Sequence, residues 1–106
     1  MADLLKRLVG PVQLAGAAAT VYTTPAATIT TIRCIHIVNT SASAVGFTMS
    51  LGADAAGTRI YNSYTIAGAD VFDWTGSIVM NAAEILQMYA GTAATLTAIV
   101  SGVESA

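Results

Sequence analysis

The sequence contains one histidine and one cysteine, which stand two residues apart in the segment Ile32–Asn39. Positions i and i+2 of an extended strand point to the same face, so strict alternation places Cys34 and His36 on one face, with Ile32 and Val38. A histidine that contacts a thiol can act as its general base and yield a nucleophilic thiolate. Such a site also needs a side chain that orients the imidazole, and this strand supplies none. We therefore expect a sheet or interface histidine with one ring nitrogen bonded locally, and predict no catalytic residue.

Acidic side chains are the next candidates for chemistry, as ligands of a metal ion. Asp54, Asp70 and Asp73 fall in or beside segments rich in Gly and Ala. Their spacing is not that of a calcium loop, and one cysteine provides neither a disulfide partner nor the paired ligands of a zinc site. Gly52–Gly57 lacks the lysine that follows a phosphate-binding loop. We predict turn acids that accept backbone N–H bonds, and neither a metal nor a cofactor.

Aromatic side chains could form a stacking platform for a sugar. The candidates are Tyr61, Phe72 and Trp74. Phe72 and Trp74 alternate with Val71 and Asp73, which predicts that both rings face a core rather than solvent. Sugar binding therefore stays an alternative reading of these residues.

The composition excludes several classes of protein. The chain has 106 residues, of which 55% are hydrophobic and 9% charged, with a net charge of −2. Four basic residues against six acidic ones exclude nucleic acid as a main partner, because phosphate binding requires clustered Lys and Arg. No apolar run approaches the roughly 18 residues of a membrane span, and the high hydrophobicity argues against disorder. The N-terminus does not follow the order of a signal peptide, so we expect synthesis and use without Sec export.

Turn residues at regular intervals separate short runs rich in Thr, Val and Ile, which favour strands. No helical pattern of about 10 to 15 residues intervenes, as a parallel α/β sheet would require. The sequence therefore predicts an all-β fold: an antiparallel, jelly-roll-like β-sandwich of about eight short strands. The predicted strands are 19–23, 28–39, 44–51, 58–66, 71–75, 77–80, 84–90 and 95–103.

The first eleven residues differ from the rest of the chain. Asp3 is a suitable N-cap, Leu4 and Leu8 share a helical face, and Gly10 with Pro11 would end a helix of two turns. We predict a short N-terminal helix or arm over residues 1–11, followed by a single β-sandwich domain over 12–106. The arm either caps its own sandwich or binds a neighbouring subunit. If it is an anchor, deletion of residues 2–10 should abolish binding to the larger assembly and leave the β-sheet signal unchanged. Its candidate partner-binding residues are Leu4, Leu5, Lys6, Arg7 and Leu8.

Large apolar side chains are predicted on both faces of two strands. Val79 alternates with Ile78 and Met80, and Ile35 and Ile37 alternate with residues of the His36 face. A small isolated sandwich covers only one face of each sheet. With so little charge, this pattern favours burial of an outer surface against other copies or a larger scaffold. The alternative is a monomer with an uncharged surface of Ala and Thr.

Several segments of the sequence resemble a group of small virion structural proteins of tailed bacteriophages. They are Val21–Pro25, Ile35–Ser41, Ser50–Arg59, Asp73–Gly76, Gln87–Gly91 and Leu96–Glu104, together with the start Leu-Leu-Lys-Arg-Leu. The resemblance spans nearly the whole chain and implies an antiparallel β domain built into the particle. Most specifically, it implies a head decoration (cement) protein that binds the outside of the capsid lattice. It brings no catalytic residue.

Further expectations follow from this resemblance. The partners would be the major capsid protein or other virion proteins, and the location would be the virion, assembled in the bacterial host cytoplasm. A homo-oligomer is expected, with a trimer favoured because capsid lattices offer threefold positions. Two alternatives stay open: a tail- or fibre-associated module that binds a host surface glycan, and a small hydrolase that would need Cys34 and His36 in contact.

Overall fold

The computed structural model describes the chain over residues 4–106, apart from the side chain of Leu4. These residues form eight strands and no helix, which confirms the predicted all-β class. The strands are β1 (Leu4–Gln13), β2 (Ala19–Thr23), β3 (Ile29–Asn39), β4 (Val45–Leu51), β5 (Arg59–Ile66), β6 (Val71–Met80), β7 (Ile85–Ala90) and β8 (Leu96–Ser105).

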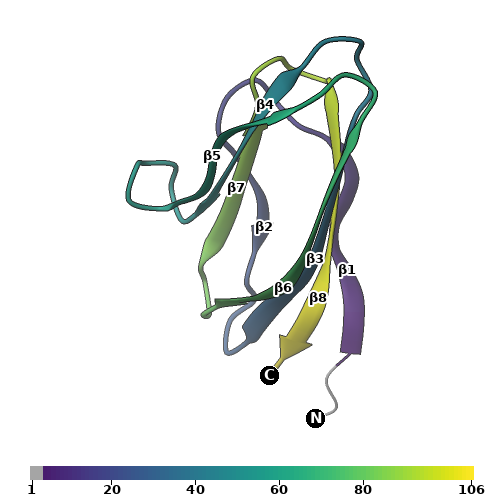
Figure 1. Cartoon of the computed structure of the whole chain (residues 1–106). Coiled ribbons are helices and arrows are strands. Elements are labelled where there is room, and N and C mark those ends of the chain that lie inside the picture. The colour runs from purple at the N-terminus through teal and green to yellow at the C-terminus, as the bar shows by residue number, and fades with distance from the viewer. Residues whose placement is uncertain (1–3) are drawn as a thin grey trace.

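The strands form two four-stranded sheets that face each other (Figure 1). Sheet A has the order β1-β8-β3-β6 and sheet B has the order β2-β7-β4-β5, with every neighbouring pair antiparallel. The chain passes from one sheet to the other at each connection except the β4–β5 hairpin. This is the strand arrangement of a jelly roll, as the turn spacing predicted.

The core lies between the sheets and follows the alternation of the strands. Phe47 and Met49 of β4 are completely buried, and so are Leu96 and Val100 of β8, as the period of two predicted. Ile99, between buried neighbours, lies on the opposite face of its strand. Buried side chains from both sheets therefore interdigitate as the inner faces of a sandwich do.

The prediction of an N-terminal helix was wrong over the described residues. Residues 4–13 form β1, an edge strand that pairs with β8 from Leu4 opposite Glu104 to Gln13 opposite Thr97. A two-turn helix is marginal in water, whereas pairing with β8 satisfies the backbone and buries Val9. Pro11 is tolerated because an edge strand leaves one side without partners. Asp3, the predicted N-cap, lies outside the described residues.

A row of β-bulges crosses sheet A, and we call it the crease. Leu8 of β1 is an extra residue opposite β8, and Arg33 of β3 is an extra residue on the other side of β8. On β6, Gly76 and Ser77 together face Arg33. The predicted strands 71–75 and 77–80 are therefore one strand with a bulge at the predicted break.

The crease requires a glycine at its centre. A Cβ added to Gly102 of β8 would lie 2.2 Å from the carbonyl oxygen of Thr31 and 2.9 Å from Cδ1 of Leu8. The first contact is with backbone of the neighbouring strand, which cannot rotate away. Gly102 therefore lets the bulges of β1 and β3 close on β8 from both sides.

The crease also changes which residues of β3 share a face. Ile32 and Ile35 are both completely buried although three positions separate them, because the bulge at Arg33 shifts the alternation by one. Cys34 and His36 lie on the opposite, outer side with Val38. The prediction that Ile32 shares the His36 face was therefore wrong, since strict alternation does not hold across a bulge.

Candidate functional site

The side of sheet A that faces away from sheet B, here called the A face, carries most of the exposed apolar side chains. Among the described residues, four of the seven large exposed hydrophobic residues belong to it: Leu5 (72% exposed), Ile29 (50%), Val71 (48%) and Val79 (54%). The outer face of an antiparallel sheet that contacts only water is usually polar. The predicted surplus of apolar surface is therefore present, and it is concentrated on one face.

Cross-strand register organises this face into rows. One row runs from β1 to β6 through Leu5, Val103, Thr31 and Val79. Towards the other end of the strands a second row contains Thr97, Val38 and Val71. Val38 and Val71 thus lie towards one end of the A face and Leu5, Val103 and Val79 towards the other. The residues between these rows include Ser101, His36 and Asp73, and also Ile99.

Arg7 and Arg33 lie between the two apolar rows, at the crease. Arg7 is opposite Ser101 of β8, and Ser101 is opposite Cys34, the neighbour of Arg33. The two strands that bear the arginines are separated by β8 alone, a spacing of about 10 Å. Both side chains are exposed, and neither forms an ion pair with another described residue.

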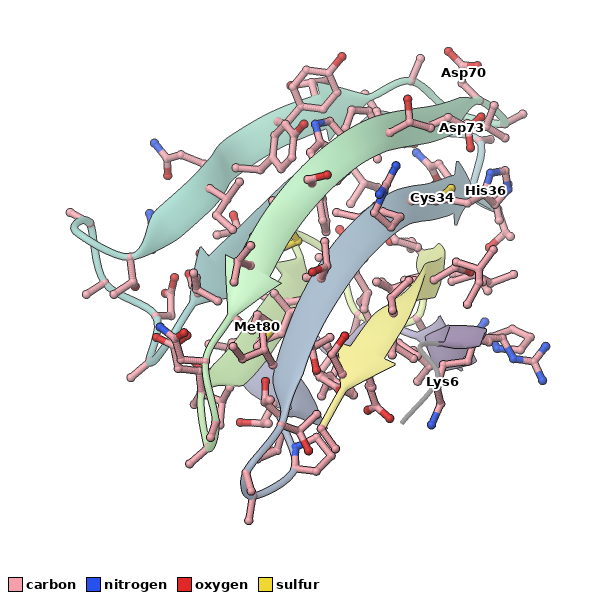
Figure 2. The ribbon with its side chains drawn as sticks, turned by 90° about the horizontal axis from the view of Figure 1, so that it is seen from below. Lys6, Cys34, His36, Asp70, Asp73 and Met80 are labelled. Carbon is pink, nitrogen blue, oxygen red and sulfur yellow. The ribbon has the colours of Figure 1, made fainter. Side chains whose placement is uncertain are left out.

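His36 pairs with Asp73 across the strands. His36 of β3 is directly opposite Asp73 of β6, and its Nδ1 contacts the Asp73 carboxylate. Figure 2 shows Cys34, His36 and Asp73 together on this side of the sheet. The prediction of a locally bonded sheet histidine agrees with this geometry. Asp73 lies within β6, inside the predicted strand 71–75. The sequence did not identify it as the partner of His36, because register between distant strands cannot be counted from spacing.

The cysteine does not complete a nucleophilic site with these residues. Cys34 is a free, partly buried thiol. No hydrogen bond joins it to His36 among the described side chains, and the Nδ1 atom of the ring is already engaged with Asp73. Within residues 4–106, no group of three or more His, Cys, Asp and Glu side chains is arranged to hold a metal ion. In the same residues, no helix has the length and apolar character to cross a bilayer.

The residues of the predicted N-terminal arm have divided roles. Leu5 and Arg7 lie on the A face, whereas Leu8 packs against the core. Lys6 donates from Nζ to Oε1 of Glu104 at 2.8 Å. The backbone of Leu4 pairs with β8, and its side chain lies outside the described residues. Two of the five candidate residues therefore remain available on the A face.

Lys6 belongs to a polar cluster that joins the two sheets. The Glu104 carboxylate also accepts a bond from the Tyr22 hydroxyl of sheet B, which accepts one from Oγ1 of Thr30 at 2.8 Å. The bond from Lys6, with that from Tyr22, lowers the pKa of Glu104. Burial, assisted by the bond to Glu104, raises the pKa of Tyr22 to about 12.

A second polar cluster lies on sheet B, where the β4–β5 connection begins. Arg59 donates from Nε and Nη2 to the two carboxylate oxygens of Asp54 at 2.9 and 3.0 Å, and Ser50 donates to Oδ1 at 2.6 Å. The Arg59 bond, followed by that of Ser50, lowers the pKa of Asp54 to about 2. Asp54 and Asp70, which accepts from the N–H of Val71, are thus structural acids of connections, as predicted.

The aromatic residues join the edges of the two sheets. Tyr61 and Tyr64 of β5 meet Phe72 of β6, with ring centroids 5.1 and 5.0 Å from Phe72. Trp74 is partly buried and packs against the core, so the prediction of inward rings for Phe72 and Trp74 agrees with the structure. Tyr64, 47% exposed, is the ring of this cluster that solvent reaches most.

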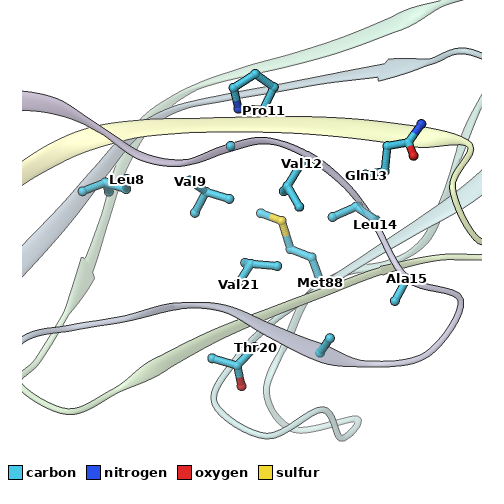
Figure 3. Close-up of a pocket in the computed structure, with 12 residues that line it drawn as sticks. Leu8, Val9, Pro11, Val12, Gln13, Leu14, Ala15, Thr20, Val21 and Met88 are labelled. Carbon is cyan, nitrogen blue, oxygen red and sulfur yellow. The ribbon is translucent and has the colours of Figure 1, made fainter.

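The opposite side of the sandwich is open between β1 and β2. A groove of about 500 Å³ is lined there mainly by apolar side chains. Figure 3 shows Val9, Val12, Val21 and Met88 pointing into this space, whereas Thr20 points away from it. Among its lining residues only Gln13 and Thr20 have polar side chains, and none of them is charged.

Two solved structures share this fold over nearly the whole chain. One is a protein of the Bacillus endospore appendages, described as disulfide-linked pili; it is 13% identical, with a TM-score of 0.57, and the match covers 96% of this chain and 86% of that one. The other belongs to infectious bursal disease virus, Gx strain; it is 12% identical, with a TM-score of 0.56, over 97% of this chain and 31% of that one. At such identities the likeness concerns the fold alone. No family model and no curated protein matches the sequence.

Proposed function

We infer that the chain is a non-enzymatic structural subunit that attaches to a larger particle through the A face. The observation that carries this proposal is the concentration of exposed Leu5, Ile29, Val71 and Val79 on one sheet face. Because the outer face of a sheet that contacts only water is usually polar, several exposed apolar side chains on one such face are typical of an interaction site. Among the described residues of the A face, the thiol of Cys34 is not hydrogen-bonded to His36, which is bonded to Asp73 instead. This arrangement favours attachment over catalysis.

The finer proposal is a head decoration protein of a tailed bacteriophage. It rests on the resemblance of the sequence segments to small phage virion proteins. It is also supported by the jelly-roll arrangement, a fold common in viral capsid domains. The partner would then be the major capsid protein or another virion protein, and the chain would be assembled into virions in the bacterial host cytoplasm. A trimer at threefold positions is the favoured oligomer, with its contacts outside the A face.

Attachment of this kind stabilises a shell through shared burial. A subunit whose A face covers a seam must lose that contact when the seam opens, at about 25 cal/mol per Å² of apolar area before association costs. Repetition over many equivalent positions multiplies a weak single contact. The arrangement needs a rigid face rather than a flexible arm, and a two-sheet sandwich provides one.

The experiment is to locate the chain in purified phage particles. Labelled antibodies would be imaged by electron microscopy, and the copy number measured by gel densitometry against the major capsid protein. We expect many copies distributed over the head. Absence from the particle would overturn the virion proposal, and a few copies confined to the tail would overturn the decoration role.

The second candidate is a tail- or fibre-associated module that binds a host surface glycan. The specific observation in its favour is Tyr64, which is 47% exposed and adjoins Tyr61 and Phe72. An exposed ring can stack on a sugar. Tail localisation together with saccharide binding that is lost in Tyr64→Ala would establish this alternative.

A further inference from the structure

We propose that the A face recognises a surface rich in carboxylates on a different protein, and that Arg7 and Arg33 receive those carboxylates. The proposal rests on the proposed function and deepens it, because it states the chemistry of the partner. It concerns one face of the molecule and leaves the other surfaces free for contacts between copies.

The four cations of the described chain fall into two groups. Lys6 is bonded to Glu104, and Arg59 is bonded to both oxygens of Asp54. Arg7 and Arg33 have no acidic partner among residues 4–106, and both project from the crease on the A face. A guanidinium prefers a carboxylate that it can bind through two parallel N–H bonds. These two arginines are therefore available to bind carboxylates of another molecule.

Their surroundings favour a protein partner over a free anion. The row of Leu5 and Val79 lies to one side of the arginines, and the row of Val38 and Val71 lies to the other. An interface in which charged contacts are bracketed by apolar ones excludes water from the charges and strengthens them. The expected partner thus presents two or more carboxylates among apolar side chains.

Charge argues against a second copy as the occupant. Every Asp and Glu side chain within residues 4–106 already accepts a bond within the chain: those of Asp54, Asp70, Asp73, Glu84 and Glu104. The one acid on the A face that stands close to the arginines, Asp73, is engaged by His36. Two A faces in contact would bring four unpaired arginines together. Juxtaposed like charges disfavour such a pairing, whereas an acidic surface is attracted.

The test uses a defined acidic probe and the whole chain. A copolymer of glutamate and tyrosine supplies carboxylates with apolar rings, and a copolymer of lysine and tyrosine is its charge-inverted control. Titration of the isotopically labelled protein would be followed residue by residue by NMR. We expect shifts centred on Arg7, Arg33 and the flanking apolar rows with the acidic copolymer, and none there with the basic one. Binding should weaken at about 1 M salt, where charges are screened within about 3 Å.

Variants distinguish the contribution of Arg7 and Arg33 to binding from the effect of the net charge of the protein. Arg7→Gln and Arg33→Gln should each lower the affinity for the acidic copolymer about fivefold to tenfold, which corresponds to loss of one charged contact. Arg59→Gln removes the same charge from sheet B and should change the affinity less than about twofold. Circular dichroism would verify that each variant is folded. If a variant does not fold, the NMR shifts of the wild-type protein still test whether the acidic copolymer binds at the arginines.

Several results would overturn the proposal. Shifts away from the A face, or equal binding of the basic copolymer, would show that the arginines do not select the partner. Concentration-dependent shifts on the A face without any probe would show that it is a contact between copies. Failure of the function proposal is distinguishable, because absence from phage particles would leave the binding of carboxylates by the A face unaffected.

Discussion

The Tyr22 hydroxyl of β2 donates a hydrogen bond to the Glu104 carboxylate of β8, and so connects sheet B to sheet A across the sandwich. Glu104 accepts a second bond from Lys6 of β1. The same tyrosine oxygen is bonded to Thr30, which is completely buried in β3. Four strands therefore meet in one polar cluster near the beginning of β1 and the end of β8, which lie side by side in Figure 1.

Replacement of Tyr22 by Phe should lower the free energy of unfolding by about 1 kcal/mol, because the buried Thr30 and the Glu104 carboxylate each lose a hydrogen bond. Burial and Glu104 raise the pKa of Tyr22 from 10.0 to about 12, so its contribution is complete below pH 10 and is lost between pH 10 and 12. Urea unfolding at neutral and alkaline pH measures both effects. The Tyr22→Phe protein should lose less stability than wild type in the alkaline range, and an equal loss would contradict the assignment.

Acid should weaken the sheet B cluster. The pKa of Asp54 is lowered from 3.8 to about 2 by Arg59 and Ser50, so its ionised form stabilises the fold above pH 4. That contribution disappears as the pH falls from about 4 to about 2. Asp54→Asn should be less stable than wild type at neutral pH and should show a flatter decline in this range. A decline as steep as that of wild type would exclude Asp54 as a source of the acid sensitivity.

The crease should tolerate no side chain at its centre. Gly102→Ala places a Cβ 2.2 Å from the Thr31 carbonyl oxygen, so β3 and β8 must separate. We expect a loss of about 2–3 kcal/mol, in the range of overpacked cores. Gly57→Ala is the matched control, since nothing lies within 4 Å of an added Cβ there, and its effect should stay within about 0.5 kcal/mol. Comparable effects for the two variants in urea unfolding would disprove close packing at the crease.

Apolar residues of the A face should matter for attachment more than for stability. The double variant Val71→Thr and Val79→Thr changes two side chains that are about half exposed, so the free energy of unfolding should change by less than about 1 kcal/mol. Occupancy on particles, measured by densitometry, should fall severalfold. Ile60→Thr alters an exposed apolar residue of β5 on sheet B and serves as control. Unchanged occupancy of the double variant would remove the A face from the proposed attachment.

Deletion of residues 2–10 should unfold or strongly destabilise the domain. The deletion removes most of β1, exposes the edge of β8 and uncovers the core beside Val9. Loss of an edge strand leaves unpaired backbone groups and open apolar surface. Circular dichroism and thermal unfolding would measure the loss. A cooperative transition near the wild-type temperature would indicate that the segment is a dispensable arm after all.

The alternation of the strands made most of the fold predictable. A period of two assigned Phe47 and Met49 to the same face and Val79 and Met80 to opposite faces, and burial agrees with both assignments. The turns were marked by residues with strong local preferences, so β2 to β8 and the antiparallel sandwich class followed from local chemistry. The predicted number of eight strands agrees only because β1 was missed and β6 was divided in two. The glycine at position 76 likewise predicted an end between two strands, and the structure has a bulge within β6 at this position.

What the sequence determined by itself was therefore local: the elements, the inward side chains away from bulges, and an excess of apolar outer surface. Tertiary structure decided that residues 4–13 form a strand, because pairing with β8 outweighs a weak helical preference. It also decided that Asp73 meets His36 and that Arg7 approaches Arg33, since register between strands distant in sequence depends on the packing of the whole sheet. The crease and this register together bring Arg7, Arg33 and the exposed apolar residues onto one face of sheet A.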